Sequence, residues 1–551
     1  MTPTALAGSG AATRPGMANA LHWEATDPDV LWSPGNVSEA IPGVSTALNW
    51  SFIDDPIELA ARSAFCAMGV LRADEVRLSD RVEDRLMTCF YGRTVANIEA
   101  MRSIGDRMPG TSANAIEEQL FGVVRPGAEN HNTLSRVPAV AARMPKASVR
   151  LRSEQLRFRA DLVRWWRAAV VSPPTDFAGA RALLEDARER YRRAFELGTL
   201  ASMLAQALYD QVVLLAATAK RPGLEHRLVT GYSDMLETGL VSDLWAAAHA
   251  EMDLESFLLR HGFHGPDEGQ MASCVWREDP APLLALLHRY QDRGPDAHPS
   301  VSEKRQLAVR EQAEDELLGA LGRLRRPGAR LVLGIARGLI PQREVGKANY
   351  TQCLDGARLA ARVIGRELAA TNAIDDPEDV FHLTYDELLV TPSDVDMRAL
   401  VAERRALRED YLTTGLADAW TGPPARVPLT SDDEPDVSVD REAIVGEAVG
   451  GGSVVGRVRV IVDPALEDLE EGEILVCRST DPGWVPLFHL AGGVAVDMGG
   501  QMSHGAIVAR ELGLPCVTCT VDATRRLRTG DLVRLDGDAG RIEILEQEMA
   551  T

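Results

Sequence analysis

The spacing of apolar residues changes along this chain, and the change constrains the fold more than any other feature. Up to about residue 416, apolar residues recur mainly three and four positions apart, which is the spacing of an amphipathic helix. After residue 444 they form short runs and alternations, such as GRVRVIV at 456–462 and EILVC at 473–477, which are typical of strands. The sequence therefore predicts a multi-domain protein, with a mainly α-helical domain followed by a small α/β domain.

A stretch without either period joins the two parts. Residues 421–445 contain prolines, an acidic cluster and few apolar side chains, a composition typical of an exposed, flexible linker. We therefore predict a disordered tail over 1–25, the helical domain over 26–420, the acidic linker over 421–445 and the α/β domain over 446–547. Such a linker would allow the last domain to move.

The first helix of the helical domain has a recognisable start signal. Asp55 is a good N-cap residue, and Pro56 would occupy the first helical position, where its missing N–H costs nothing. The apolar residues that follow have helical spacing. We therefore predict that this helix begins at Pro56, with Asp55 as its N-cap.

The charge of the chain excludes two classes of partner. Its formal net charge is −22 over 551 residues, whereas nucleic acids and anionic membrane surfaces are bound by concentrated Lys and Arg. The N-terminal residues lack the basic start and apolar core of a signal peptide, and we find no apolar run of about 18 residues that would span a membrane. We expect a cytoplasmic protein that binds neither nucleic acid nor membrane.

The cysteines point to reduced thiols. The chain has 7 of them, scattered along its length, which suits a cytoplasmic protein better than a disulfide framework. Cys516 and Cys519 form a C-x-x-C pair, but no second Cys or His pair lies nearby to complete a zinc site. We favour a buried strand over metal or redox chemistry there, and expect no metal site.

The strongest candidate for chemistry is His504, within DMGGQMSHGAIVARELGLPCV at 497–517. Ser503 is a strong N-cap candidate and Gly513 a C-cap candidate, so His504 would be the first residue of a helix. Unpaired backbone N–H groups and the helix dipole favour a bound anion at that position and keep the imidazole neutral. A neutral imidazole can attack phosphorus and form a phosphoramidate, although a histidine at a helix start is more often a cap.

One loop of the helical domain is rich in titratable groups. Within 258–280, four such residues crowd a glycine-rich break between helices: His261, His264, Asp267 and Glu268. Polar groups on a loop held by rigid helices often form a site. A solvated connection is equally consistent with the sequence.

A second stretch of the helical domain, 336–368, could bind phosphate. If it is helical from Gln342, then Arg343 and Lys347 lie one turn apart on the same face, with Glu344 three positions before Lys347. An Arg and a Lys on one face could clamp a phosphate group. The residue types alone favour the alternative, a surface salt-bridge pattern.

The C-terminal part resembles a known family through three motifs: RSTDPGWVPLF at 478–488, GGQMSHGAIVARELGLPCV around His504, and the closing LRTGDLVRLDGDAGRIEIL. They are similar to the swivelling phosphohistidine domain of the phosphoenolpyruvate-utilising enzymes, which include phosphoenolpyruvate synthase and rifampin phosphotransferase. The resemblance implies that His504 is phosphorylated. It also implies that its loop includes Gly499, Gly500, Ser503 and Arg510.

The helical part resembles the antibiotic-binding domain of rifampin phosphotransferase. The shared motifs are WSPGNVSEAIPG, HGFHGPDEG, QREVGK and DVFHLTYDELL, in the family's order. The resemblance implies that Arg343, Glu344 and Lys347 position the transferred phosphate and its acceptor, which reverses the salt-bridge interpretation. It also suggests Glu39, His264 and Glu268 as substrate-binding residues.

The family's ATP-grasp domain, which phosphorylates the histidine, has no counterpart that we recognise in this sequence. We therefore expect a separate ATP-grasp protein, supplying ATP and Mg²⁺, to load His504, as in phenylphosphate synthases, whose parts are split among subunits. The leading hypothesis is a phosphotransferase component, kinase-like in outcome, that passes phosphate to a hydroxyl of a small organic molecule. One alternative is a phosphorylatable binding or regulatory protein without catalysis. Another is an enzyme that uses His504 as a general base in elimination chemistry.

Overall fold

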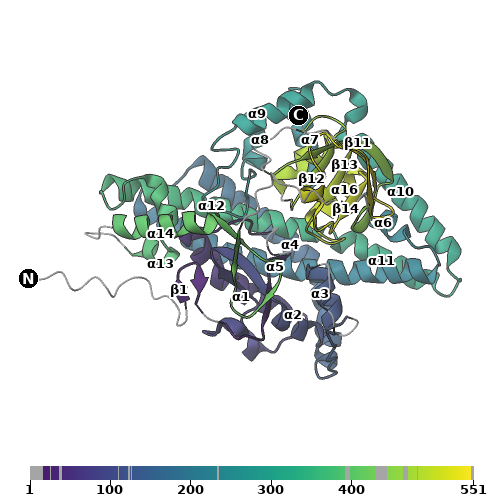
Figure 1. Cartoon of the computed structure of the whole chain (residues 1–551), viewed down its shortest axis with the longest axis horizontal. Helices are drawn as coiled ribbons and strands as arrows, with labels where there is room; N and C mark the ends of the chain where they lie inside the picture. Colours follow the sequence, from purple (N-terminus) through teal and green to yellow (C-terminus); the bar gives the residue numbers. More distant parts are fainter. Residues whose placement is uncertain are drawn as a thin grey trace, which may run out of the picture.

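The computed structural model describes residues 17–547 except 25, 36, 38–39, 109–110, 122–123, 126, 233–234, 391–396, 429–442, 463–468 and 481. Figure 1 shows a large helical part and, at the C-terminal end of the chain, a compact domain built around a sheet. The predicted fold class is therefore confirmed.

Four long helices form the core of the helical part. They are α1 (Ala47–Ala67), α4 (Val137–Val171), α5 (Phe177–Thr218) and α12 (Gln342–Ala370). Helix α5 buries apolar and small side chains three and four positions apart, and packs against α1, α4 and α12. Gly198 of α5 meets Gly346 of α12, so the two backbones approach closely there.

The start predicted for the first helix is wrong. Helix α1 begins at Ala47, where the Thr46 side chain accepts a hydrogen bond from the Asn49 backbone N–H, and the helix continues through Pro56. Residues before Pro56 such as Trp50 and Phe52 are almost completely buried. Their burial stabilises helical turns that the proline would otherwise end.

The remaining helices surround this core and carry the chain to the C-terminal domain. They are α2 (Ile98–Gly105), α3 (Ala113–Phe121), α6 (Leu224–Leu228), α7 (Leu236–Ala248), α8 (Leu254–His261), α9 (Ala281–Gln291), α10 (Pro299–Ala320), α11 (Arg326–Leu339), α13 (Tyr385–Leu389) and α14 (Arg398–Leu412). Short 3₁₀ turns lie at Ala73–Glu75, Val82–Asp84, Pro295–Ala297, Pro377–His382 and Pro482–Trp484.

The helical part also contains small sheets that the sequence did not predict. One has the strand order β4 (Met87–Phe90), β5 (Arg93–Asn97), β3 (Leu31–Ser33) and β7 (Trp420–Thr421), and another pairs β6 (Thr414–Leu416) with β8 (Arg426–Pro428). Strands β1 (Met17–Asn19) and β2 (His22–Trp23) pair within the segment predicted as a disordered tail. The regular structure thus begins before residue 26.

The linker prediction coincides partly with regular structure. Strands β7 and β8 lie within or beside the predicted 421–445 stretch, and β9 (Ile444–Val445) pairs with the C-terminal strand. Residues 429–442 lie outside the described part of the chain. The linker prediction for those residues therefore stays a prediction.

The C-terminal domain is built on a mixed sheet of the order β10-β14-β13-β12-β11-β15-β16-β9. Its other strands are β10 (Glu447–Gly450), β11 (Ser453–Val460), β12 (Ile474–Cys477), β13 (Gly493–Val496), β14 (Cys516–Thr518), β15 (Leu532–Asp536) and β16 (Arg541–Glu546). Strands β11 to β14 run parallel. The helices are α15 (Val485–Phe488), α16 (His504–Leu512) and α17 (Ala523–Arg526). Cys516 is buried in β14, as predicted.

The C-terminal domain docks onto the helical part. In Figure 1 it lies between α7–α9 and α10–α11, beside α6. Trp245 and Tyr290 of the helical part share an apolar cluster with Phe488 and Val508 of the C-terminal domain. The backbone N–H of Tyr232 donates to Glu511 at 3.1 Å, and Thr230 donates to the Arg510 carbonyl at 2.7 Å. We refer to this arrangement as the docked state.

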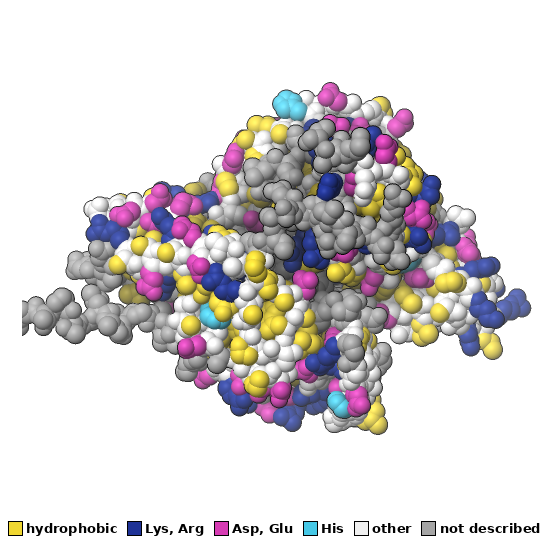
Figure 2. Space-filling view, in the orientation of Figure 1, with side chains coloured by type: hydrophobic (Ala, Val, Ile, Leu, Met, Phe, Trp, Pro, Cys, Tyr) yellow, Lys and Arg dark blue, Asp and Glu magenta, His cyan; other side chains and the backbone are white. Residues whose placement is uncertain are grey.

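The sequence analysis found no apolar run long enough to span a membrane, but helix α5 contains one. It contains a window of mean hydropathy 1.4, so by length and composition alone it could cross a bilayer. Its packing against α1, α11 and α12 identifies it instead as a core helix of the helical part. Figure 2 shows basic and acidic side chains interspersed over the described residues of the face in view.

Candidate active site

His504 is held at the start of α16, as predicted. The Ser503 side chain accepts a hydrogen bond from the Ala506 backbone N–H at 3.4 Å, and Gly513 ends the helix in the left-handed conformation with φ 71°. Gly499, in the preceding loop, has φ 114°, a conformation that favours glycine. The local sequence therefore places the imidazole at the first turn of the helix.

The docked state brings His504 against α12 of the helical part. Its Nδ1 lies 2.8 Å from Oε2 of Glu344, and both side chains are 1% exposed. Nη1 of Arg343 lies 3.5 Å from the other oxygen of Glu344. Because an ionised carboxylate can only accept, Nδ1 carries the proton. The other nitrogen, Nε2, is buried and has no hydrogen-bond partner among the described residues.

The electrostatics of the site keep this histidine neutral. Burial lowers the pKa of His504 from 6.5 to about 4, and the charge of Lys347 acts in the same direction against the opposing effect of Glu344. Burial acts to raise the pKa of Glu344, but His504, Arg343 and Lys347 together hold it below its usual range. The result is an ionised carboxylate bound to a neutral imidazole whose Nε2 lone pair is free.

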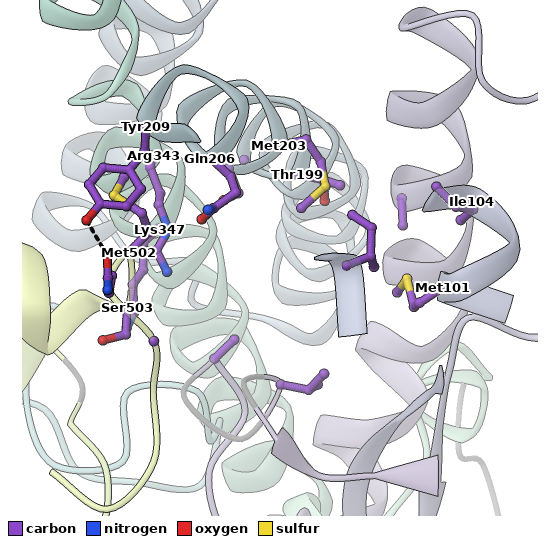
Figure 3. A pocket seen from close by; sticks show the side chains of 18 of the residues that line it. Met101, Ile104, Thr199, Met203, Gln206, Tyr209, Arg343, Lys347, Met502 and Ser503 are labelled. Atoms are coloured by element: carbon purple, nitrogen blue, oxygen red, sulfur yellow. Dashed lines mark hydrogen bonds between the residues drawn. The ribbon is translucent and has the colours of Figure 1, made fainter. Parts of the chain in front are cut away.

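A cavity of about 530 Å³ adjoins the site. Arg343, Glu344 and Lys347 line it together with the loop residues Gly500 to Ser503. Figure 3 shows Arg343 and Lys347 beside Met502 and Ser503, while Met101 and Ile104 lie at the other end and Met203 lies between the two groups. Further apolar residues complete the wall, among them Ile41, Phe65, Ile116 and Phe195. The cavity is therefore charged next to His504 and apolar away from it.

Arg510 supports the loop before His504. Its Nη2 donates to the carbonyl oxygen of Gln501, and its guanidinium lies 5.7 Å from the centre of the Tyr209 ring. Tyr209 of α5 in turn donates to the Gln501 side chain, as the dashed line in Figure 3 shows. Arg510 and Tyr209 thus fix the loop backbone against the helical part in the docked state.

Two of the predicted substrate-binding residues, His264 and Glu268, lie away from the cavity wall. Nδ1 of His264 lies 2.6 Å from Glu268 in a buried pair. Burial lowers the pKa of His264 to about 3 and raises that of Glu268 to about 8, so both are neutral near pH 7. Neither is among the described residues that line the cavity, although the charge of Lys347 reaches Glu268. Glu39 lies outside the described residues.

The structure adds Glu237 of α7, which the sequence analysis missed. Atoms of Glu237, Glu344 and His504 lie within 4.8 Å of one another, and all three side chains are buried. These are ligand types that a metal ion could use, but the positive charges of Arg343 and Lys347 beside them disfavour a cation. The sequence around Glu237 gave no signal, because an acidic residue in the first turn of a helix is ordinary.

Comparison with known protein families agrees with this geometry. Residues 469–540 match the family described as PEP-utilising enzyme, mobile domain, and residues 202–344 match the rifampicin phosphotransferase fourth domain. Residues 469–540 are therefore similar to the mobile domain of PEP-utilising enzymes, and we refer to the C-terminal domain as the mobile domain. The mobile domain contributes His504 and Arg510 to the site, and the fourth domain contributes Glu237, Arg343 and Glu344, with Lys347 just beyond its matched end.

Curated relatives point the same way. The rifampicin phosphotransferase of Streptomyces sviceus is 34% identical over 309 residues, which cover 53% of this chain and 34% of that protein. The one of Bacillus cereus is 31% identical over 307 residues, covering 53% and 34%. An uncharacterised protein of Mycobacterium tuberculosis is 31% identical over 344 residues, covering 61% and 36%. The chain thus spans about a third of the length of these relatives.

Proposed function

We propose that this chain is a phosphotransferase component in which His504 carries a phosphoryl group to a hydroxyl of an organic molecule. The observation that supports it most is the docked His504, whose Nδ1 is bound to Glu344 while Nε2 is free, next to Arg343 and Lys347. The relatives named rifampicin phosphotransferase support the same reaction class.

In the proposed loading step, Nε2 attacks a phosphorus atom of ATP that a separate ATP-grasp protein holds with Mg²⁺. The N–P bond forms, and the bond from that phosphorus to the bridging oxygen breaks as the nucleotide leaves. Because Nε2 is buried in the docked state, loading requires the mobile domain to leave the helical part.

In the proposed transfer step, the mobile domain returns and the acceptor oxygen attacks phosphorus. The P–O bond forms, the N–P bond breaks, and its electron pair returns to Nε2. The hydroxyl proton passes to the Glu344 carboxylate and then to water. A weak base such as this carboxylate is sufficient, because charge develops mainly on the transferred phosphoryl group and little on the attacking oxygen. The flexible side chains of Arg343 and Lys347 move to accommodate and neutralise that group.

The cavity supports a sizeable, largely apolar acceptor. Its apolar wall, rich in methionine and phenylalanine, would bury a hydrophobic body, and its charged end lies beside His504. Methionine side chains adapt their shape to irregular ligands. We therefore propose an organic molecule that presents one hydroxyl towards Arg343 and Lys347.

The test uses the chain with a stand-alone ATP-grasp protein, ATP labelled on its β-phosphate or, in a second reaction, on its γ-phosphate, and rifampicin as the first acceptor. Wild type and the R343A and K347A variants are expected to become labelled, but only wild type should pass label to the acceptor. The H504A variant should take up none. K304A, which removes an exposed lysine of α10, serves as the control and should behave as wild type. Equal labelling of H504A would refute phosphate carriage by His504.

A further inference from the structure

Glu237 contributes a second buried carboxyl beside His504. It lies in the first turn of α7, is 8% exposed, and belongs to the matched fourth domain. Its Oε2 is buried and has no hydrogen-bond partner among the described residues. The charges of Glu344 and Lys347, both on α12, act on it, and its carboxyl lies within 4.8 Å of the Glu344 carboxylate. A buried carboxyl oxygen without a partner is costly unless the group has a specific role.

Glu237 and Glu344 cannot both be ionised at this separation without strong repulsion. Glu344 holds the charge, because His504 Nδ1 lies 2.8 Å away and Arg343 lies 3.5 Å away. Burial and the charge of Glu344 raise the pKa of Glu237 well above its usual value. Glu237 therefore keeps its proton and can act as a hydrogen-bond donor to its neighbour.

We propose that Glu237 is a positioning residue for phosphotransfer, whose carboxyl donates a hydrogen bond to Glu344 and fixes that carboxylate against Nδ1 of His504. The inference rests on the proposed function. By fixing Glu344, Glu237 selects the His504 tautomer with a proton on Nδ1 and a lone pair on Nε2. Because Glu237 keeps its proton, a phosphorylated His504 faces the negative charge of only one carboxylate, that of Glu344. Arg343 and Lys347 offset that charge.

The test compares E237M with E237Q. Met keeps the volume of the side chain but cannot donate, whereas Gln remains a neutral donor. The first readout is the ring ¹⁵N shifts of His504 in histidine-labelled, unphosphorylated protein, assigned by their loss in H504A. Wild type and E237Q should show the Nδ1–H tautomer, and E237M a mixture of both tautomers. E255A is the control, because Glu255 lies exposed in the first turn of α8.

The second readout is transfer from loaded His504. E237M should slow it by about 10- to 100-fold, as a misplaced reacting group does, and E237Q should recover most of that loss. Wild-type tautomer signals in E237M would overturn the proposal, and so would an E237Q that behaves like E237M. The tautomer readout needs no phosphate. If His504 fails to accept label, the proposed function is refuted, and the tautomer of His504 in E237M and E237Q still shows separately whether Glu237 positions Glu344.

Discussion

The contact between α5 and α12 makes a sharp prediction about the geometry of the site. Gly346 lies on α12 between Glu344 and Lys347 and faces Gly198 of α5. A Cβ built on Gly346 lies 2.6 Å from the Gly198 Cα, whereas a Cβ built on Gly198 lies 3.6 Å from the Gly346 Cα. To reach the ordinary contact, G346A must push this part of α12 away by about 1 Å. G198A needs no such movement.

The expected magnitudes follow from that displacement. Overpacking costs about 1 to 3 kcal/mol, and replacing a helical Gly by Ala recovers about 1 kcal/mol, so G346A should lose about 0 to 2 kcal/mol of stability. A displacement of about 1 Å at a reacting group can cost about 100-fold in rate. G346A should therefore lose far more transfer activity than stability, and G198A should be as stable as wild type or more so.

The assay separates loading from transfer. Each variant is phosphorylated with phosphoramidate, a small-molecule donor, and the rate at which labelled His504 passes phosphate to rifampicin is then measured in a single turnover. Urea denaturation gives the stability of the same samples. If G346A transfers phosphate as fast as G198A, the placement of Arg343, Glu344 and Lys347 by this helix contact is refuted.

Two further predictions concern pH. Burial raises the pKa of Glu511 to about 8 in the docked state. The contribution of protonated Glu511 to stability is therefore fully present below the ordinary pKa of 4.5 and is lost as pH rises towards 8. The loss is at most about 1.4 kcal/mol per pH unit. E511Q stays neutral and should be more stable than wild type at pH 8 by calorimetry; parallel pH curves would contradict this. Burial acts to raise the pKa of Asp355, but Arg277, Arg358 and Trp166 hold it at about 2. The contribution of ionised Asp355 to stability is therefore present above its ordinary pKa of 3.8 and is lost as pH falls through about 2. D355N should lose about 3 to 5 kcal/mol at pH 7, with the difference from wild type narrowing in acid; a constant difference would show that the charge of Asp355 contributes nothing.

Local signals in the sequence predicted the mobile domain well. Ser503 and Gly513 mark the two ends of α16, and both act as caps in the structure. Short apolar runs predicted strands such as β11 and β12. These elements were predictable because caps and strand periodicity depend on neighbours in the sequence.

Elements that depend on distant residues escaped prediction. The sheet that pairs β3 with β7 joins Leu31–Ser33 to Trp420–Thr421, and such short strands carry too little pattern to detect. The proline signal for α1 failed because tertiary burial extends the helix past it. Both the pairing of β3 with β7 and the start of α1 depend on burial and packing, which cannot be read from the local sequence.

The candidate site was predictable only in part. His504, Arg343, Glu344 and Lys347 were singled out from motifs, and the structure brings them together. His264 and Glu268 form a separate buried pair beside Lys347 rather than part of the cavity wall. Glu237 was missed because only docking of the mobile domain places its carboxyl near His504.

The most direct test of this account is the position of the phosphoryl group after loading with phosphoramidate. ³¹P and ¹⁵N spectra of the histidine-labelled chain identify which residue and which ring nitrogen carry it, and H504A supplies the reference. Because Nδ1 is bound to Glu344 while Nε2 is free, we predict a single phosphorylated site at Nε2 of His504. Phosphate on Nδ1, or uptake by H504A equal to that of wild type, would contradict the account.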